Sequence, residues 1–499
     1  MPPTALRRHV ARGLGALASG VPLFRPGTSL PGASAPLMGA PPPGAAKARG
    51  STRGRLRQSL RVSVTEGMFA EVFTACAGAT VLTAWAVALK LGPFLVGVMT
   101  ALPFFAQFVQ FPAAWLTGGF GHRRVALAAV CLSRLVMFPL ALVPWLDWGL
   151  VATQRLLLAI AGASAVLGVV GNNAWVAWMG ELVPHAVRGR FFGRRTALTT
   201  LAGTVVSLAA GGLMDRLRPD GGVGVALPLL ALVGCGIGII TTLLMALQHD
   251  PAPPGPLPAR AMQAALQPLK DVRVRGVLVY QVAWNAAVGV SAPFFALHSL
   301  QNLQMTFVLM ALHAAAVAAV RILTVPWWGQ VIDRVGAQPV LLGCSLGIGV
   351  IPALWLLPSA DCLWPLVFDA VLAGALWGGH ALAIFALPLT VAPREGRPFY
   401  LAAIATAGGL AYTAAAALGG GIAARLPATF TLGGLPWVNL HVLFVLSSVA
   451  RLAAALLVTH VDEPGARPVR SLGALLPRWL TRPAFDTALA RSRARAPRR

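Results

Sequence analysis

The sequence predicts an all-α membrane protein whose twelve transmembrane helices form two pseudo-symmetric bundles of six. Hydrophobic residues make up 57% of the chain and charged residues only 11%, whereas a soluble domain carries about 25% charge. Apolar stretches of about 20 residues, the length needed to cross a bilayer, follow one another along the chain. Short matches also repeat from the first half of the chain to the second, which predicts two like halves.

The apolar stretches extend from Glu66 to His460 and define the twelve spans. They are continuously apolar and do not alternate between polar and apolar residues, which excludes a membrane β-barrel. We place them at residues 66–89, 94–117, 124–145, 151–181, 192–213, 224–247, 274–297, 303–325, 338–357, 363–391, 398–423 and 435–459.

The internal repeat has an offset of 209 residues. Pro184 and Arg188 recur as Pro393 and Arg397. The same offset relates Gly211, Gly212, Arg216 and Leu217 to Gly420, Gly421, Arg425 and Leu426. Because six spans return the chain to the same side of the membrane, the halves are parallel repeats, and two such halves can rock to expose a central site alternately. The repeat therefore predicts a carrier.

Loop charge predicts that both termini are cytoplasmic. With that orientation the inner loops hold thirteen basic residues and the outer loops and span ends hold five, as the positive-inside rule requires. Residues 1–65 add ten basic side chains and no acid, and the tail from Arg467 adds nine arginines against one acid, Asp486. Beside membrane spans such ends are typical of anchors on anionic lipid. We therefore expect the lipid bilayer as a partner, no nucleic acid, and a location in a bacterial inner (plasma) membrane.

The predicted organisation has five parts. They are a disordered basic N-terminal tail (1–61), a first six-helix bundle (62–248), a cytoplasmic linker (249–273), a second six-helix bundle (274–460) and a basic C-terminal tail (461–499). The linker opens on a proline-rich run, and proline blocks helix propagation. A transit peptide and a misassigned start codon are the alternatives for residues 1–60.

One loop motif carries a family resemblance. Between spans 8 and 9 the chain reads Gly329-Gln-Val-Ile-Asp333-Arg334-Val-Gly336. This resembles the loop Gly-x-x-x-Asp-Arg/Lys-x-Gly of the major facilitator superfamily, and the resemblance covers about residues 62–460. It implies that Asp333 pairs with basic groups or a helix N-terminus across the two halves and that Gly336 permits the turn. An ordinary loop ion pair is the alternative. In the first-half copy Gly118 stands where the family has the acid.

A second inner loop follows span 4 and is rich in arginine. It begins at Glu181 and continues to Arg195, and it is similar to the inner loop of bacterial major facilitator permeases. Glu181 is expected to pair with an arginine, because an unpaired acid at that depth is costly. A gate that breaks and reforms and a static salt bridge both remain open. The predicted cytoplasmic gate comprises Arg123, Arg124, Glu181, Arg188, Arg190, Arg194, Arg195, Arg321, Gly329, Asp333, Arg334, Gly336, Arg394 and Arg397.

Polar groups within spans are candidates for a solute site, because lipid cannot solvate them. The resemblance implies that spans 1, 4, 7 and 10 line a central cavity, where Glu71 and Asp369 would titrate during proton coupling; structural pairing is the alternative. Amide and aromatic groups suit a polar or aromatic solute, with interhelical hydrogen bonding as the alternative. The predicted cavity comprises Glu71, Asn172, Asn173, Trp175, Trp178, Gln281, Trp284, Asn285, Asp369, Trp377 and His380.

Two further arginines lie within spans. Arg134 in span 3 and Arg451 in span 12 belong to spans that the resemblance places at the periphery. Both are therefore expected to snorkel toward the membrane surface or to pair locally.

The predicted function is secondary active transport of a small organic solute by alternating access, as a permease working by symport or antiport. Proton coupling is one option that the residues leave open, and efflux is the direction weakly favoured because so few charges line the spans. The chain has no Gly-x-x-x-x-Gly-Lys-Ser/Thr sequence for ATP, and its five cysteines lack metal-site or disulfide spacing. We expect no cofactor, no metal and no enzymatic activity. A non-transporting membrane protein, either a receptor-like sensor or a membrane-embedded enzyme, is the alternative.

Overall fold

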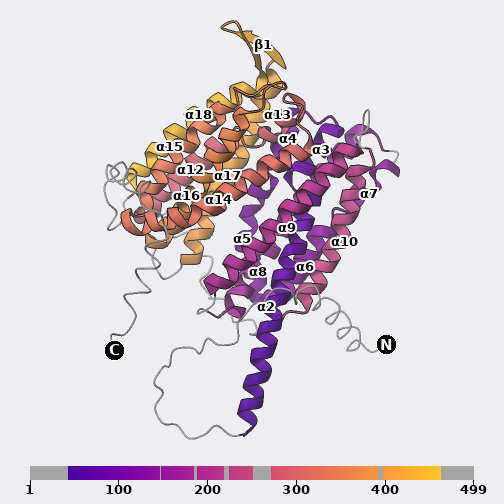
Figure 1. Ribbon diagram of the computed structural model, residues 1–499, viewed down its shortest axis with the longest axis vertical. Coiled ribbons are helices and arrows are strands. Elements are labelled where there is room, and N and C mark those ends of the chain that lie inside the picture. The colour runs from indigo at the N-terminus through magenta and orange to yellow at the C-terminus, as the bar shows by residue number, and fades with distance from the viewer. Residues whose placement is uncertain are drawn as a thin grey trace, which may run out of the picture. The chain divides into compact units, whose positions relative to one another are not determined.

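The computed structural model describes residues 43–145, 148–184, 188–217, 224–250, 271–391, 397–461 and 463 (Figure 1). The elements up to residue 250 are α2 (Pro43–Ala77), α3 (Ala79–Ala88), α4 (Pro93–Phe105), η1 (Ala106–Val109), α5 (Gln110–Phe120), α6 (His122–Leu135), α7 (Phe138–Leu142), η2 (Val143–Trp145), α8 (Leu150–Leu182), α9 (Arg188–Arg216) and α10 (Ala226–Ala246).

The elements from residue 271 onward mirror this helical pattern and add one hairpin. They are α12 (Val272–Gly289), α13 (Phe294–Gln301), α14 (Phe307–Val335), α15 (Ala337–Leu354), α16 (Pro365–Val391), α17 (Arg397–Arg425), β1 (Thr429–Leu432), β2 (Leu435–Val438), α18 (Asn439–Leu456) and η4 (Leu457–His460).

Within the described residues, eleven helices are long and apolar enough to cross a membrane. The predicted all-α membrane fold is therefore confirmed. The remaining predicted span, 94–117, is divided into α4, η1 and α5. Pro103 lies inside α4 and Pro112 near the start of α5. Proline removes a backbone donor and disturbs the preceding turn, which explains the short 3₁₀ segment between these two helices.

The chain divides into two compact units by its internal contacts. The first unit comprises residues 1–85 and 112–257, and the second comprises residues 86–111 and 258–499. The helix α4 therefore belongs to the second unit, although the sequence repeat places it in the first half. The predicted bundle limits of 62–248 and 274–460 stay a prediction.

The first unit is built around α2. This helix packs against α9 and α10, and α6 packs against α8 and α10. Where α2 meets the end of α8 and the start of α9, Leu60, Val64, Val183 and Phe191 form a buried apolar cluster. The cluster fixes α2 against the start of α9, and this contact positions the polar groups described below.

The second unit holds α4 against α17 through glycines. A Cβ atom on Gly97 would lie 2.5 Å from the carbonyl oxygen of Ala416, and one on Gly409 would lie 2.4 Å from that of Phe104. The Thr413 hydroxyl donates to the Ala101 carbonyl at 3.4 Å. Small residues let helix backbones approach in this way. The same unit pairs α12 with α17, α14 with α16, and α15 with α16 and α18.

A two-stranded hairpin interrupts the otherwise helical chain between α17 and α18. In it β1 pairs antiparallel with β2, Thr429 opposite Val438 and Leu432 opposite Leu435. Gly433 and Gly434 form the turn with φ of 61° and 79°. Positive φ at both central residues is the requirement of the two-residue hairpin turn. The sequence prediction did not include this hairpin, although the glycine pair is its usual signal.

We predict that Gly409→Ala destabilises the protein. The added methyl group would meet the Phe104 carbonyl oxygen, so α4 and α17 must separate, at a cost of about 1–3 kcal/mol for overpacking. Gly236→Ala in α10 is the matched control, because nothing lies within 4 Å of a Cβ atom there and alanine favours helix by about 1 kcal/mol. Thermal unfolding of the purified proteins in detergent measures both. Equal melting temperatures for the two variants would contradict the close approach.

Candidate functional site

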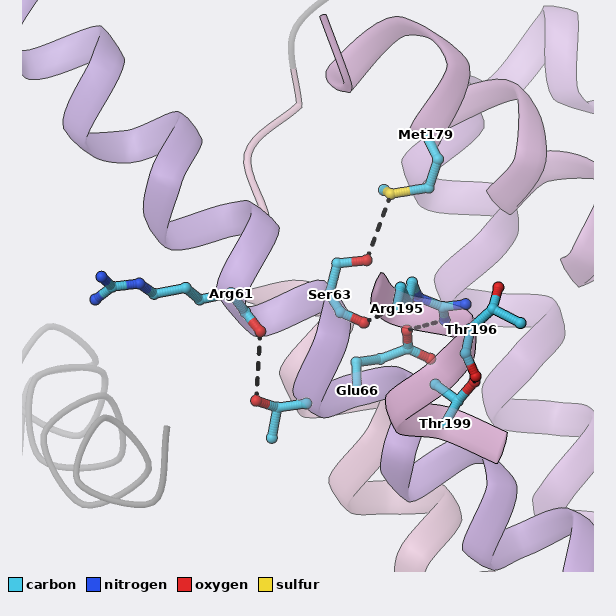
Figure 2. Close-up of polar contacts among 8 residues, drawn as sticks. Arg61, Ser63, Glu66, Met179, Arg195, Thr196 and Thr199 are labelled. Atoms are coloured by element: carbon cyan, nitrogen blue, oxygen red, sulfur yellow. Dashed lines mark hydrogen bonds and ion pairs between the residues drawn. The ribbon is translucent and has the colours of Figure 1, made fainter. Parts of the chain in front are cut away.

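A buried ion pair joins the first and fifth predicted spans in the first unit. The Arg195 guanidinium of α9 lies 3.3 Å from the Glu66 carboxylate of α2. Its Nε also donates to the Ser63 carbonyl oxygen at 3.2 Å. The Ser63 hydroxyl contacts the sulfur of Met179 at 3.6 Å. Figure 2 shows these side chains gathered between the helices. One turn of α2 thus meets both α9 and α8.

Burial makes this pair sensitive to its surroundings. Glu66 is only 4% exposed. A charge removed from water is tolerated when partners compensate it, and losing one partner leaves the other strongly destabilised. A second cation, Arg134 of α6, lies within electrostatic range of Glu66. Its guanidinium lies 5.1 Å from the centre of the Phe73 ring. Arg195 is thus the bonded partner of Glu66, and Arg134 adds a more distant positive charge from another helix.

Arg195 also covers an aromatic ring. Its guanidinium carbon lies 4.4 Å from the centre of the Trp175 ring on α8, which is a favourable cation–π distance. The indole Nε1 of Trp175 is buried and has no hydrogen-bond partner among the described residues. Arg195 consequently connects α2, α8 and α9 through one side chain.

Glu71 lies along the same contact between α2 and α9, further along α2. Its side chain is half-buried beside Gly203, where a Cβ atom would lie 3.2 Å from the Glu71 carboxylate. Arg195 lies within electrostatic range of Glu71 as well. The described part of the chain offers this carboxylate no ion-pair partner. Two carboxylates in one helix therefore share a single arginine, and only Glu66 is bonded to it.

The other predicted residues of span 4 lie in different surroundings. Trp178 is fully buried, and its indole donates to the His249 carbonyl oxygen at 3.2 Å. Asn172 is exposed and Asn173 is half-buried. Of this group, only Trp175 is joined to the Glu66–Arg195 pair.

In the second unit an aromatic cluster unites the predicted residues of spans 7 and 10. The Trp284 ring stacks on the His380 ring with centroids 4.9 Å apart. Trp377 meets Trp284 edge-on at 6.1 Å. The Tyr280 hydroxyl lies 2.9 Å from His380 Nε2 and 2.8 Å from the Ser345 hydroxyl. Three rings and a hydrogen-bonded tyrosine thus pack together as one cluster between α12 and α16.

Gln281 and Asn285 lie on a neighbouring face of α12, toward α17. Both approach Gly408, where a Cβ atom would lie 2.9 Å from the Asn285 amide nitrogen. Asn285 donates to the Gln281 backbone carbonyl at 2.8 Å. The side-chain oxygen of Gln281 is buried and finds no donor among the described residues. This oxygen could accept a hydrogen bond from a solute.

Asp369 is fully engaged. Its carboxylate lies 2.9 Å from His313 Nε2 and accepts the Trp355 indole hydrogen at 3.0 Å. Asp369 is 3% exposed. The sequence reasoning overlooked His313 and Trp355 as its partners, because they lie on α14 and at the end of α15.

The predicted gate residues fall into several separate groups. Among the side chains that the structure describes, Glu181 lies 3.5 Å from His122 Nδ1. Arg123 donates to the Ala246 carbonyl oxygen at 2.6 Å, at the end of α10. Arg124 is exposed and Arg194 half-buried. Arg195, which was predicted as a gate residue, belongs instead with Glu66 and Trp175.

The loop motif of residues 329–336 covers the last turns of α14 and the turn before α15. Gly336 has φ 97° and ψ 167°, and Gly121, at the corresponding turn before α6, has φ 89° and ψ 143°. Both glycines thus permit a backbone conformation that other residues resist. Asp333 and Arg334 are exposed near the end of α14. Arg321, earlier in the same helix, is exposed as well. Gly329 lies in open space within α14.

Four predicted gate residues cannot be placed in the same way. Arg394 lies outside the described residues, as do the side chains of Arg188, Arg190 and Arg397.

The structure decides between the two alternatives predicted for the arginines of spans 3 and 12. Arg134 is 8% exposed and Arg451 is 2% exposed, so neither snorkels to the membrane surface. Each points into its unit, because the rotation of its helix places it on the packed side. The sequence shows these arginines but not this rotation.

The chain is similar in fold to known membrane transporters. The sequence model of the Major Facilitator Superfamily matches residues 67–416, and no curated protein matches the sequence. Similar solved structures include the nucleoside transporter NupG, at 12% identity over 81% of this chain and 98% of that chain, with a TM-score of 0.59. The xylose transporter XylE from E. coli, in an inward open conformation, is 13% identical over 84% and 99%, with a TM-score of 0.60. A bacterial homologue of the iron transporter ferroportin is 14% identical over 81% and 98%, with a TM-score of 0.58. At these identities the likeness establishes the fold.

We predict that Arg195→Met destabilises the protein by about 3 kcal/mol, because the substitution leaves the Glu66 carboxylate buried without its nearest cation. Adding Glu66→Gln to the same chain should recover most of the loss, because the uncompensated charge is then gone. Arg155→Met in α8 serves as the control, since Arg155 is exposed. Chemical or thermal unfolding in detergent measures all four proteins. If the double variant is no more stable than Arg195→Met, the charge pair is not what stabilises this contact.

Proposed function

The chain belongs to the Major Facilitator Superfamily, and we propose that it is a secondary active transporter that moves a small organic solute by alternating access, coupled to protons. It is a multi-pass membrane transporter and not an enzyme. The finer proposal concerns how it is driven and what it moves. The observation that carries it is the set of Glu66, Glu71 and Arg195 within the first unit.

The charges of this set support a proton site. Glu66 and Glu71 are both within range of Arg195, and only Glu66 is bonded to it. A proton on Glu71 changes the charge around Arg195 by one unit, and the surrounding lipid cannot solvate that charge. Such a change shifts the balance between two arrangements of the same helices by the difference in their interaction with that charge. Glu71, half-buried and without an ion-pair partner among the described residues, is the group best placed to take up the proton.

The aromatic cluster of the second unit supports an organic solute. Trp284, Trp377 and His380 offer ring faces and edges, and the buried oxygen of Gln281 offers an acceptor. Binding sites for small molecules combine apolar walls with a few such polar groups. Structures of similar fold are described as a nucleoside transporter and as a D-xylose-proton symporter. Their fold agrees with a carrier of small solutes, and the rings here favour an aromatic or planar one.

The proposed orientation places both termini in the cytoplasm of a cell with an inner (plasma) membrane. It rests on the excess of basic residues in alternate loops.

We predict that Glu71→Gln uncouples transport from the pH gradient. Purified protein in liposomes loaded with a pH-sensitive dye should show solute-dependent proton entry, using solutes first selected by thermal shift from a metabolite library. In Glu71→Gln, uptake driven by the pH gradient should fall by about tenfold or more. Solute exchange at equal pH on both sides should persist, because it needs no net proton movement.

The control is Asp361→Asn, an exposed acid in the loop before α16, which should retain both activities. Glu66→Gln removes the counter-ion of Arg195 and should impair exchange as well as uptake. Full pH-driven uptake by Glu71→Gln would exclude Glu71 from the proton path. A wild-type protein that binds solutes but moves none of them would overturn the transport proposal itself.

A further inference from the structure

A cation lies buried in the second unit, and no described carboxylate pairs with it. Arg451 of α18 is 2% exposed. The guanidinium keeps its charge in proteins, and an uncompensated charge at membrane depth is costly. A buried guanidinium in a helix bundle therefore needs a negative or polar group that balances its charge.

Arg451 makes only some of the hydrogen bonds that its guanidinium can donate. One Nη2 hydrogen goes to the Ser291 hydroxyl at 3.1 Å. Ser291 lies 2.9 Å from the Ser447 hydroxyl, which itself donates to the Ala287 carbonyl oxygen at 2.6 Å. Ser447 must therefore accept the hydrogen of Ser291, and the chain of donors runs away from the arginine. The Nε of Arg451 is buried and finds no acceptor among the described residues.

No acid in the described part of the second unit takes the role of counter-ion. Asp369, the buried carboxylate there, is already held by His313 and Trp355. The remaining described acids of the unit do not pair with Arg451: Asp271, Asp333, Asp361 and Glu463. Of these, Asp271 accepts from Tyr400, and Glu463 accepts from the first backbone amides of α15. The positive charge of Arg451 thus has no carboxylate partner among the described residues of the second unit.

Its position connects this charge to the aromatic cluster. Ser447, one turn before Arg451 on α18, donates to the Ala287 carbonyl oxygen, one turn beyond Trp284 on α12, and Trp284 stacks on His380. The Arg451 guanidinium also interacts electrostatically with His380 and with the buried Tyr412 of α17. The cation and the rings therefore belong to one region of the second unit, reached by α12, α16, α17 and α18.

We propose that Arg451 binds an anionic group, and that this group is the carboxylate of an aromatic or planar organic acid whose ring contacts Trp284, Trp377 and His380. The proposal rests on the transport function above and narrows its solute class to organic anions. A guanidinium recognises a carboxylate through paired, charge-assisted hydrogen bonds, and the adjacent rings would hold the apolar part of the solute. A free inorganic anion such as chloride offers the same charge from another source.

The experiment compares one pair of probes that differ in charge and one pair of anions that differ in size. The melting temperature of the purified full chain is measured with benzoate and with benzamide, and separately with chloride and with the larger isethionate at equal ionic strength. A ligand that binds only the native state raises stability, so benzoate should raise the melting temperature and benzamide should not. A rise in melting temperature with chloride but not with benzoate would show that the site binds a free inorganic anion and not an aromatic carboxylate. Equal melting temperatures within both pairs would overturn the proposal.

Variants of Arg451 locate the effect. Arg451→Gln should weaken benzoate binding at least tenfold, whereas Arg451→Lys, which keeps the charge, should retain a measurable response. Arg425→Gln, at the exposed end of α17, should bind as the parent does. If Arg451→Gln does not fold, the wild-type comparison of benzoate with benzamide still decides the outcome. Benzoate binding without flux in liposomes would leave this site standing and overturn transport, so the two proposals fail separately.

Discussion

The bilayer cannot solvate charge, and this constraint governs how the helices of the protein are rotated and paired. Each buried charge must point at a partner on another helix. Glu66 and Arg195 set α2 against α9. Asp369 and His313 set α16 against α14. Arg451 and Ser291 set α18 against the turn that follows α12. Apolar packing would tolerate several rotations of these helices, because lipid and leucine are equally apolar, so the few polar contacts are what select one.

The proposals about function follow from places where this pairing is incomplete. In the first unit Arg195 lies near two carboxylates and is bonded to one of them, and in the second unit Arg451 is bonded to no carboxylate of the described residues. The two proposals are that a proton balances the first charge set and that an anion balances the second. The two units therefore differ in chemistry although the sequence repeat relates them, which agrees with one half handling the driving ion and the other the solute.

Much of the fold was predictable because its signals are local. Hydropathy located the spans, Pro103 and Pro112 explain the divided second span, and the pair Gly433–Gly434 explains the hairpin. The candidate site was predictable only in part. Trp284, Trp377 and His380 were recognised from the sequence, and the structure brings them together. The bond between Glu66 and Arg195 spans 129 residues, and helix rotation decides it. For the same reason the sequence left open whether Arg134 and Arg451 snorkel or pair locally, and both lie inside.

The helix α4 has a consequence for how the protein is joined together. Because residues 86–111 belong to the second unit while their neighbours on both sides belong to the first, the backbone passes between the units at three places. The proline-rich segment after His249 is only one of them. Movement between the units must therefore bend the chain near Trp85 and near Phe111 too. A nick in that proline-rich segment would not release two independent pieces, since the N-terminal fragment would still carry a helix that completes the other one.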